Sequence, residues 1–201
     1  QKQTDGSLDH ASSSGRPRRP STPSTNALSR AGSRGDCGMP RMLHLEVACA
    51  ENRTIGRGGR LPWSIPEDTR LFHEHTAGQV VILGRVSFDD WQGSREEGRR
   101  AVVVTQHAVP SRPGVFAAGT FAEALRIADT LPGRIHICGG ERIYAEALAV
   151  ARPLRLNLTL VHAQVAGDRH FPEWRQLAWQ EISRREGRDE NFRYTFLCLE
   201  R

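Results

Sequence analysis

The sequence predicts an α/β fold in a single domain, with helices on the faces of a mostly parallel sheet. From residue 43 onward, short apolar runs alternate with helical segments, which is typical of a sheet covered by helices. The run 79–83 is apolar from its second residue, as expected of a strand buried on both faces. The chain has 201 residues, 38% hydrophobic and 25% charged, enough for one well-cored domain. We therefore expect an eight-stranded sheet with an antiparallel C-terminal strand and four flanking helices.

The first strand and the first helix have clear sequence boundaries. Residues 43–50 form an apolar strand, and a glycine-rich loop then leads toward a helix. Ser64 and Glu67 match a capping box at the start of this helix, and Pro66 suits its first turn. Gly78 is placed to close the helix two residues after Thr76.

The rest of the chain continues the alternation. Gly84 and Arg85 open a short helix after the strand 79–83. A polar segment, 184–191, separates the last two strands, so we expect these strands to form an antiparallel hairpin. The remaining elements are strands at 101–105, 135–138, 154–162, 178–183 and 192–199, and helices at 120–130 and from 141 to about 150.

The positive charge is concentrated at the N-terminus. The chain carries a formal net charge of +5. Residues 1–41 contribute most of this charge, with seven basic and three acidic side chains. Residues 42–201 hold 21 basic and 20 acidic side chains, so a basic domain that grips nucleic acid is not expected there. Residues 1–41 are rich in Ser, Pro, Gly and Arg, which predicts a disordered tail. The tail is open to three interpretations: a misassigned gene start before Met42, a transit peptide, or a basic arm for an anionic partner.

The cysteines and the hydropathy exclude several classes of protein. The four cysteines form no C-x-x-C pair, which makes a zinc site improbable, and His73 and His75 point in different directions on a helix. We expect no metal. Cys49, Cys138 and Cys198 lie in apolar runs, which favours small buried side chains in a reduced, cytoplasmic protein. No apolar stretch approaches the ~20 residues that cross a bilayer.

The helix after Trp63 carries a candidate catalytic acid. Asp68, Leu71, Phe72 and His75 follow one another at i, i+3, i+4 and i+7, so one carboxylate shares a helix face with large apolar side chains. If this face lines a cleft, burial would raise the pKa of Asp68 and suit it to proton transfer near neutral pH. The alternative is a solvent-exposed acid that interacts with the helix dipole.

Two glycine-containing segments are candidates for binding phosphate. Gly139 and Gly140 join a strand to a helix, where free backbone N–H groups suit an anion; the spacing is not that of a Rossmann fingerprint, and a simple packing turn remains possible. Arg85 follows Gly84 at the end of a buried strand, with Ser87 two residues on, and an arginine fork matches a phosphate well.

The order and spacing of these motifs resemble the dihydrofolate reductase family over residues 42–201. The matching segments are 48–56 (ACAENRTIG), 61–63 (LPW) with 66–68 (PED), 81–85 (VILGR), 137–144 (ICGGERIY) and 167–172 (GDRHFP). The resemblance implies an NADPH-dependent enzyme that reduces 7,8-dihydrofolate to tetrahydrofolate, with hydride transfer to C6 and protonation of N5. Such an enzyme supplies one-carbon metabolism and is a target of antifolates. We expect a monomer that binds a small-molecule substrate.

For the substrate, the resemblance implies one acid and a set of supporting side chains. Asp68 matches the acid that holds the pterin, Thr159 its hydrogen-bonding partner, and Trp63 the side chain that orders a water beside the pterin. Phe72 matches the ring that packs on the substrate, and Arg99 matches the arginine that binds the α-carboxylate of its glutamate tail.

For the cofactor, the resemblance implies a mobile loop from Gly56 to Leu61 and an unusual cis peptide bond at Gly139–Gly140. Arg85 matches the residue that reads the 2′-phosphate. The full set of expected cofactor contacts is Ala48, Ile55, Gly56, Leu61, Gly84, Arg85, Ser87, Thr105, Cys138, Gly139, Gly140, Arg142 and Tyr144, of which Tyr144 also stands beside the acid.

Four positions depart from the family pattern. Glu46 stands where an aliphatic side chain usually lies against the pterin, so a second carboxylate near Asp68 would raise the pKa of Asp68 or alter ligand binding. Val86 stands where a basic or polar side chain usually helps to bind phosphate. Glu96 replaces an apolar side chain in a loop beside the substrate, and Gln106 replaces a small side chain beside the 2′-phosphate of the cofactor. Two other functions stay open: a related pteridine or pyrimidine reductase on the same fold, and a nucleic-acid-binding role of the basic tail.

Overall fold

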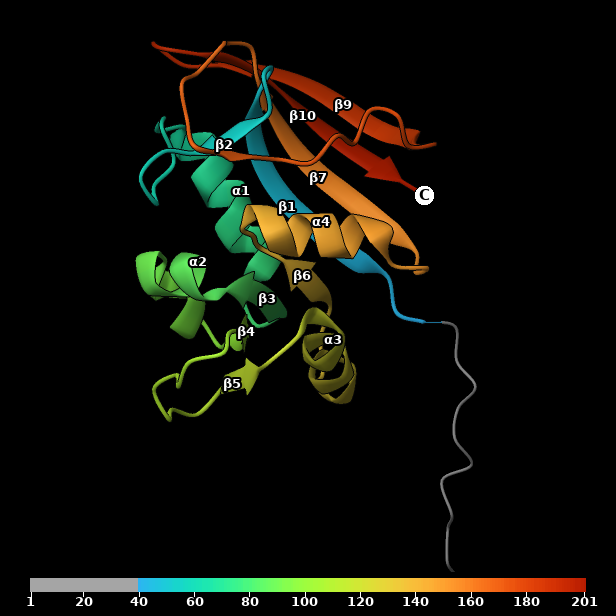
Figure 1. Cartoon of the computed structure of the whole chain (residues 1–201). Helices are drawn as coiled ribbons and strands as arrows, with labels where there is room; N and C mark the ends of the chain where they lie inside the picture. Colours follow the sequence, from blue (N-terminus) through green and yellow to red (C-terminus); the bar gives the residue numbers. More distant parts are fainter. Residues whose placement is uncertain (1–39) are drawn as a thin grey trace, which may run out of the picture. The chain divides into compact units, whose positions relative to one another are not determined.

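The computed structural model describes residues 40–201, apart from the side chains of Gln92 and Arg95. An eight-stranded sheet forms its centre, with the strand order β5-β4-β3-β6-β1-β7-β10-β9, and β2 and β8 form a small second sheet (Figure 1). The strands are β1 (Leu43–Ala50), β2 (Thr54–Gly56), β3 (Val80–Gly84), β4 (Arg100–Val104), β5 (Val115–Ala118), β6 (Ile135–Ile137), β7 (Leu154–Val161), β8 (Arg169–His170), β9 (Gln180–Arg188) and β10 (Arg193–Glu200). The helices are α1 (Pro66–Thr76), α2 (Arg85–Asp90), α3 (Phe121–Thr130), α4 (Glu141–Ala149) and a 3-10 turn, η1 (Gln92–Arg95).

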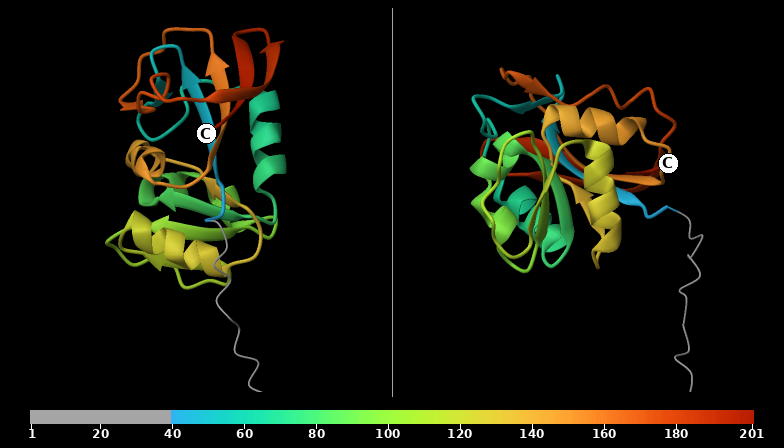
Figure 2. Two further views of the ribbon diagram at one scale, coloured as in Figure 1. Left: turned by 90° about the vertical axis from the view of Figure 1, so that its right-hand side faces the viewer. Right: turned by 60° about the horizontal axis from the view of Figure 1, so that its bottom comes forward.

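The sheet is parallel except where β10 joins it. Strand β10 runs antiparallel to both β7 and β9, whereas the other neighbours in the large sheet are parallel. Helix α1 lies on one face of the sheet, and α3 and α4 lie on the other (Figure 2). Strands β1, β3, β4 and β6 are buried almost throughout because both of their faces are covered. The predicted fold class, with its antiparallel C-terminal strand and four flanking helices, is therefore confirmed.

Strand β1 separates from β6 partway along its length. The β1–β6 pairing ends at Leu45, which lies opposite Ile137, whereas the β1–β7 pairing continues to Ala50. Beyond Leu45, the β6 side of β1 is therefore free of sheet hydrogen bonds to β6. A gap of this kind between neighbouring parallel strands is where ligands bind in open α/β sheets.

Helix α1 does not start with the predicted capping box. Ile65 is the N-cap residue and no side chain caps the helix, so Ser64 lies one residue outside it. Pro66 explains this start, since it brings no N–H that needs a partner. Glu67 instead accepts a hydrogen bond from the hydroxyl of Tyr194 (3.0 Å) and pairs with Arg185 (2.9 Å).

The C-terminal hairpin is present but longer than predicted. Residues expected in a polar loop form the second half of β9, and the turn is confined to a few residues near Asp189, whose carboxylate accepts the backbone N–H groups of Asn191 and Phe192. Strand β9 forms one border of the sheet and is exposed along most of its length, so it needs no apolar face. The eighth strand of the sheet, β5, lies where the sequence analysis assigned none.

The predicted disordered tail, residues 1–41, lies outside the described residues except for Pro40 and Arg41. Arg41 packs on the end of α3, where its guanidinium donates to the carbonyl oxygens of Ala128 (2.9 Å) and Leu131 (3.1 Å). Its own carbonyl accepts a hydrogen bond from Arg152 (3.1 Å). Arg41 thus contacts the folded part of the chain, one residue before the predicted boundary.

Candidate active site

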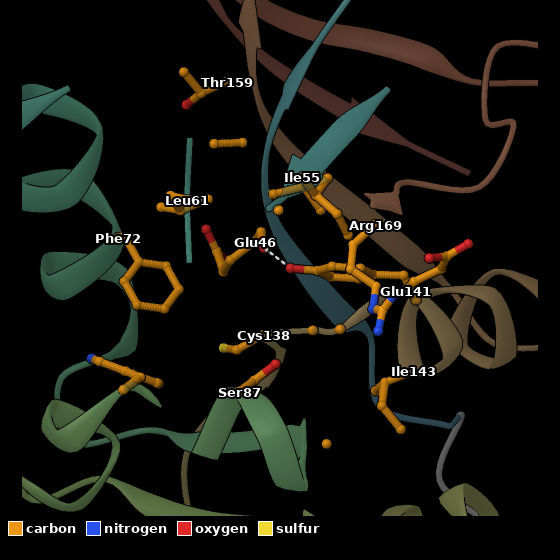
Figure 3. Close-up of a pocket in the computed structure, with 18 of the residues that line it drawn as sticks. Glu46, Ile55, Leu61, Phe72, Ser87, Cys138, Glu141, Ile143, Thr159 and Arg169 are labelled. Atoms are coloured by element: carbon orange, nitrogen blue, oxygen red, sulfur yellow. Dashed lines mark hydrogen bonds between the residues drawn. The ribbon is translucent and has the colours of Figure 1, made fainter. Parts of the chain in front are cut away.

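A cavity of about 1590 Å³ opens where β1 separates from β6. Its walls come from β1, α1, the starts of α2 and α4, and β7, so segments far apart in the sequence meet around it (Figure 3). The volume exceeds the ~300–1,000 Å³ typical of a site for one small ligand. The cavity is therefore large enough for two ligands side by side.

Asp68 and Thr159 form a hydrogen-bonded pair on the cavity wall. Asp68 lies in the first turn of α1, and the hydroxyl of Thr159 on β7 donates to its Oδ1 at 2.6 Å. The β1–β7 register sets Thr159 beside Ala48, so both face the cavity. The structure thus brings together Asp68 and Thr159, which are 91 positions apart in the sequence.

The surroundings of Asp68 shift the titration of its carboxyl group to higher pH. Burial raises the pKa of Asp68, the hydrogen bond from Thr159 lowers it in part, and the negative charge of Glu46 raises it further. The pKa of this carboxyl consequently lies above its usual range. The alternative of a solvent-exposed first-turn acid does not fit this environment. Asp68 is suited to hold or relay a proton in a ligand that contacts it.

Apolar side chains form much of the wall near Asp68. Phe72 projects from α1 toward the cavity, and Ile55 and Leu61 lie across from it (Figure 3). Trp63, the other side chain expected beside the substrate, is not among the residues that line the cavity. It is 8% exposed and packs with Ile65 and Tyr194, and its indole N–H has no hydrogen-bond acceptor among the described residues.

A pair of glycines leaves the backbone bare at the start of α4. The Gly139–Gly140 peptide bond is cis, as the resemblance implies, and Gly139 has φ +99°. A Cβ on Gly139 would lie 3.3 Å from the ring of Tyr144, and Gly84 packs closely on the same turn with its N–H bonded to the carbonyl of Gly139 (2.8 Å). The first N–H groups of α4 have no partner within the helix and lie at the cavity wall, with Cys138 and Ser87 nearby.

Basic and polar side chains line the cavity beyond this turn. Arg85 is held at the edge by Asp89 (2.6 Å) and by the carbonyl of Ala108 (2.6 Å). Thr105 and Arg142 also line the cavity. With the bare backbone of α4, they form a donor-rich region that suits a phosphorylated ligand. All of the expected cofactor contacts lie on the wall of the cavity: Ala48, Ile55, Gly56, Leu61, Gly84, Arg85, Ser87, Thr105, Cys138, Gly139, Gly140, Arg142 and Tyr144.

Arg99 is the substrate-binding candidate that the structure does not bring to the cavity wall. It is 4% exposed, and its guanidinium bonds to Thr76 (3.0 Å), to the carbonyl of Gly93 (3.0 Å) and to Glu97 (2.6 Å). It therefore joins α1 to the 3-10 turn. The contact of Arg99 with α1 could not be predicted from its place in the sequence, directly after the loop that ends at Gly98.

Glu46 stands out in the sequence, but the side chains that bind it do not. Its Oε1 accepts hydrogen bonds from Nδ1 of His136 (2.9 Å) and from the amide of Asn157 (2.7 Å), and its Oε2 contacts Nδ1 of His75 (3.0 Å). Tyr144 donates to the carbonyl oxygen of Glu46 (2.6 Å). Burial alone would raise the pKa of Glu46, but the hydrogen bonds from His136 and His75 outweigh burial and lower the pKa to about 2. The signal was present: Glu46 alternates with apolar residues on β1, and His75 shares a helix face with Asp68.

Comparison with known proteins decides the family. The family model described as dihydrofolate reductase matches residues 42–201, the whole of the described domain apart from its first two residues. The chain belongs to the dihydrofolate reductase family. It is 38% identical to dihydrofolate reductase type 3 of Salmonella typhimurium over 143 residues, which cover 71% of this chain and 86% of that protein. It is 36% identical to the dihydrofolate reductase of Neisseria meningitidis serogroup B, covering 77% of this chain and 95% of that protein.

A solved dihydrofolate reductase has the same fold. The enzyme from Enterococcus faecalis, complexed with NADP(H) and RAB-propyl, superposes with a TM-score of 0.69 and 28% sequence identity, covering 81% of this chain and 97% of that one. The chain is thus an enzyme, an oxidoreductase of the dihydrofolate reductase family. Within residues 40–201, no group of three His, Cys, Asp or Glu side chains is arranged to hold a metal ion, and no helix is long and apolar enough to span a bilayer.

Proposed function

We propose that this chain uses NADPH to reduce 7,8-dihydrofolate to tetrahydrofolate, with Asp68 as the acid that serves the substrate. The observation that carries the proposal is the buried, hydrogen-bonded Asp68–Thr159 pair at one side of a cavity large enough for two ligands. A carboxylate beside apolar walls matches a 2-amino-4-oxopteridine, because its two oxygens can accept hydrogen bonds from the amino group and the ring N–H on one edge of that ligand.

The residues at the glycine turn fit NADPH. Gly84 and Gly139 pack closely on α4: a Cβ on Gly84 would lie 3.5 Å from Ile143, and a Cβ on Gly139 would lie 3.3 Å from Tyr144. The free N–H groups of α4 suit a pyrophosphate, and Arg85, Thr105 and Arg142 suit the further phosphate that distinguishes NADPH from NADH. When bound, NADPH supplies the hydride that reduces C6 of the pterin.

The residues around Asp68 would control the proton that the reduction requires at N5. Asp68 holds the amino group and N3 of the pterin, and the hydroxyl of Thr159 fixes the orientation of its carboxylate. Trp63 would order the water that delivers the proton, a role that its unpartnered indole N–H supports. Phe72 packs on the pterin face, and Ile55 and Leu61 line the same cavity. Tyr144, fixed by its bond to the carbonyl of Glu46, contacts the nicotinamide side.

The test is a spectrophotometric assay of NADPH oxidation that depends on dihydrofolate. Replacing Asp68 with Asn keeps the shape of the side chain but removes its charge, so turnover at pH 7 should fall by about 10²–10⁴-fold. Activity should recover in part at acid pH, where the substrate is already protonated. Glu74→Gln is the matched control, since Glu74 is an exposed carboxylate on the same helix that pairs only with Arg70 among the contacts described (2.7 Å). Unchanged turnover in Asp68→Asn would remove Asp68 from the reaction.

We also propose that the folded domain carries the activity without the N-terminal tail. A variant that begins at Pro40 keeps the bonds of Arg41 to α3. It should oxidise NADPH with dihydrofolate at the rate of the full chain. Loss of activity with the tail would instead assign a catalytic part to the first 39 residues, and a nucleic-acid-binding assay on both forms would test the basic-arm alternative.

A further inference from the structure

The cavity contains a second buried carboxylate besides Asp68. Glu46 is 6% exposed, lies on the cavity wall, and projects from β1 toward α1 (Figure 3). Its hydrogen bonds come from three different elements: β6 through His136, β7 through Asn157 and α1 through His75. An ionised carboxylate can only accept hydrogen bonds, so three donors converging on one carboxylate hold it in its charged form.

The two histidines that bind Glu46 differ in their access to solvent. The side chain of His136 is 2% exposed and stacks on His44 with ring centroids 5.0 Å apart. The side chain of His75 is 42% exposed. His75 therefore exchanges protons with bulk water, whereas His136 is enclosed. The hydrogen bond to Glu46 raises the pKa of His75, and partial burial opposes this rise. The net charge of the Glu46–His75 pair is zero when His75 is protonated and −1 when it is neutral.

We propose that Glu46 is a second carboxylate which, together with Asp68, favours the protonated form of the bound substrate, and that His75 sets how much of its negative charge the substrate feels. This inference rests on the proposed function. Glu46 and Asp68 line the same cavity, so a pterin seated on Asp68 lies in the field of both. A positive charge that develops at N5 is stabilised by each of them. Glu46 acts by its charge and His75 as a positioning residue.

The pair counteracts a rise in pH. When His75 loses its proton, Glu46 is no longer neutralised, and the cavity holds a proton on the substrate more strongly. Two protonated groups that repel each other titrate over a wider pH range than either alone. The loss of activity toward alkaline pH should therefore be shallower than for a single proton.

Other charged and titratable groups surround the pair and are left unchanged in the test. On α1 they are Asp68 and Glu74, and Arg185, which lines the cavity, is paired with Glu67. Groups on other elements are also close to the pair. They are His44, Arg134, His136, Cys138, Tyr144, Arg155 with its partner Glu200, and Cys198.

The experiment is the pH profile of kcat for the full chain from pH 5 to 9. Glu46→Gln keeps the shape of the side chain but removes its charge. The pH at which kcat falls to half on the alkaline side should therefore be lower by about one unit, which makes kcat about tenfold lower than in the wild type at a pH above both midpoints. His75→Gln keeps a donor for Glu46 without a charge, so its midpoint should move up and its slope should become that of a single proton. Glu190→Gln, an exposed carboxylate near the β9–β10 turn, is the control and should change nothing.

Opposite shifts in the two variants would support the proposal, because a purely structural role would lower both rates without moving the midpoints in opposite directions. Shifts in the same direction, or none, would overturn it. A second readout does not use activity: the NMR titration of His75 in the free protein should move to lower pH in Glu46→Gln, and an unmoved titration would overturn the pairing itself. If the wild type shows no dihydrofolate-dependent oxidation of NADPH, the proposed function fails, and the NMR result still decides whether the pair exists.

Discussion

Acid should weaken the fold through a histidine at the start of β1. His44 is 7% exposed and stacks on His136. Burial and the neighbouring His136 lower the pKa of His44 from 6.5 to about 4, against a smaller opposing effect of Glu46. A group whose pKa is lower in the folded state binds more protons when unfolded, so the fold loses stability as the pH falls from about 6.5 toward 4.

The size of this loss follows from the two pKa values. With about 1.36 kcal/mol per pKa unit, the contribution of His44 changes by at most about 2 kcal/mol between pH 7.5 and pH 5, and by about 1 kcal/mol if solvent screens half of the effect. Glu46 adds a similar loss only at lower pH, because its pKa falls from 4.5 to about 2. His75 acts in the opposite direction, since its raised pKa stabilises the fold at acid pH. The comparison must therefore be made between variants.

The assay is urea unfolding of the wild type and His44→Leu at pH 7.5 and pH 5. Leucine replaces the titrating ring with an apolar side chain of similar size. The wild type should lose about 1–2 kcal/mol more free energy of unfolding between these pH values than His44→Leu does. His107→Leu, which removes an exposed histidine, should follow the wild type. Equal losses in the wild type and His44→Leu would refute the assignment to His44.

Three further outcomes are expected. Arg85→Ala should weaken NADPH binding by about tenfold or more and NADH binding much less, as measured by fluorescence titration; equal losses would show that Arg85 does not read the 2′-phosphate. Thr159→Val should lower kcat at pH 7 by about tenfold, because it removes the hydrogen bond to Asp68. Thr159→Ser keeps the hydroxyl and should retain most of the wild-type kcat. A wild-type kcat in Thr159→Val would show that the hydroxyl has no part in the reaction. Gly167→Ala should lower the free energy of unfolding by about 2–3 kcal/mol, because the added Cβ would overlap Thr54 and the carbonyl of Gly56. Gly119→Ala is the control, since the nearest atom to its Cβ would be an oxygen of the flexible Glu123 carboxylate at 3.4 Å. Equal stability of the two variants would contradict the clash.

The central sheet and the site on Asp68 were largely predictable from sequence. Strands β3 and β4 are almost entirely apolar because both of their faces are covered, and this pattern does not depend on any distant residue. Asp68 could be singled out because helical spacing alone places it with Phe72. Its partner Thr159 came only from the family resemblance, since the β1–β7 register that brings it close is not local information.

Elements without an apolar pattern were predicted less well. The second half of β9 consists of exposed polar residues, so nothing in its sequence distinguishes it from a loop; its pairing with β10 decides its structure. The capping box at Ser64 failed because Pro66 moved the helix start by one residue. The donors around Glu46 were missed because His75, His136 and Asn157 belong to three elements, and only the tertiary fold brings them to one carboxylate.

The shortness of β6 has a mechanical consequence. In the described part of the chain, β6 is the only strand that joins β3, β4 and β5 to β1, β7, β10 and β9, and it does so through three residue pairs on each side. A twist of one half of the sheet against the other is therefore concentrated in Ile135–Ile137. The cavity begins where this junction ends, with Arg85 on one half and Thr159 on the other. Rotation about β6 would thus change the distance between Arg85 and Thr159, and with it the width of the cavity.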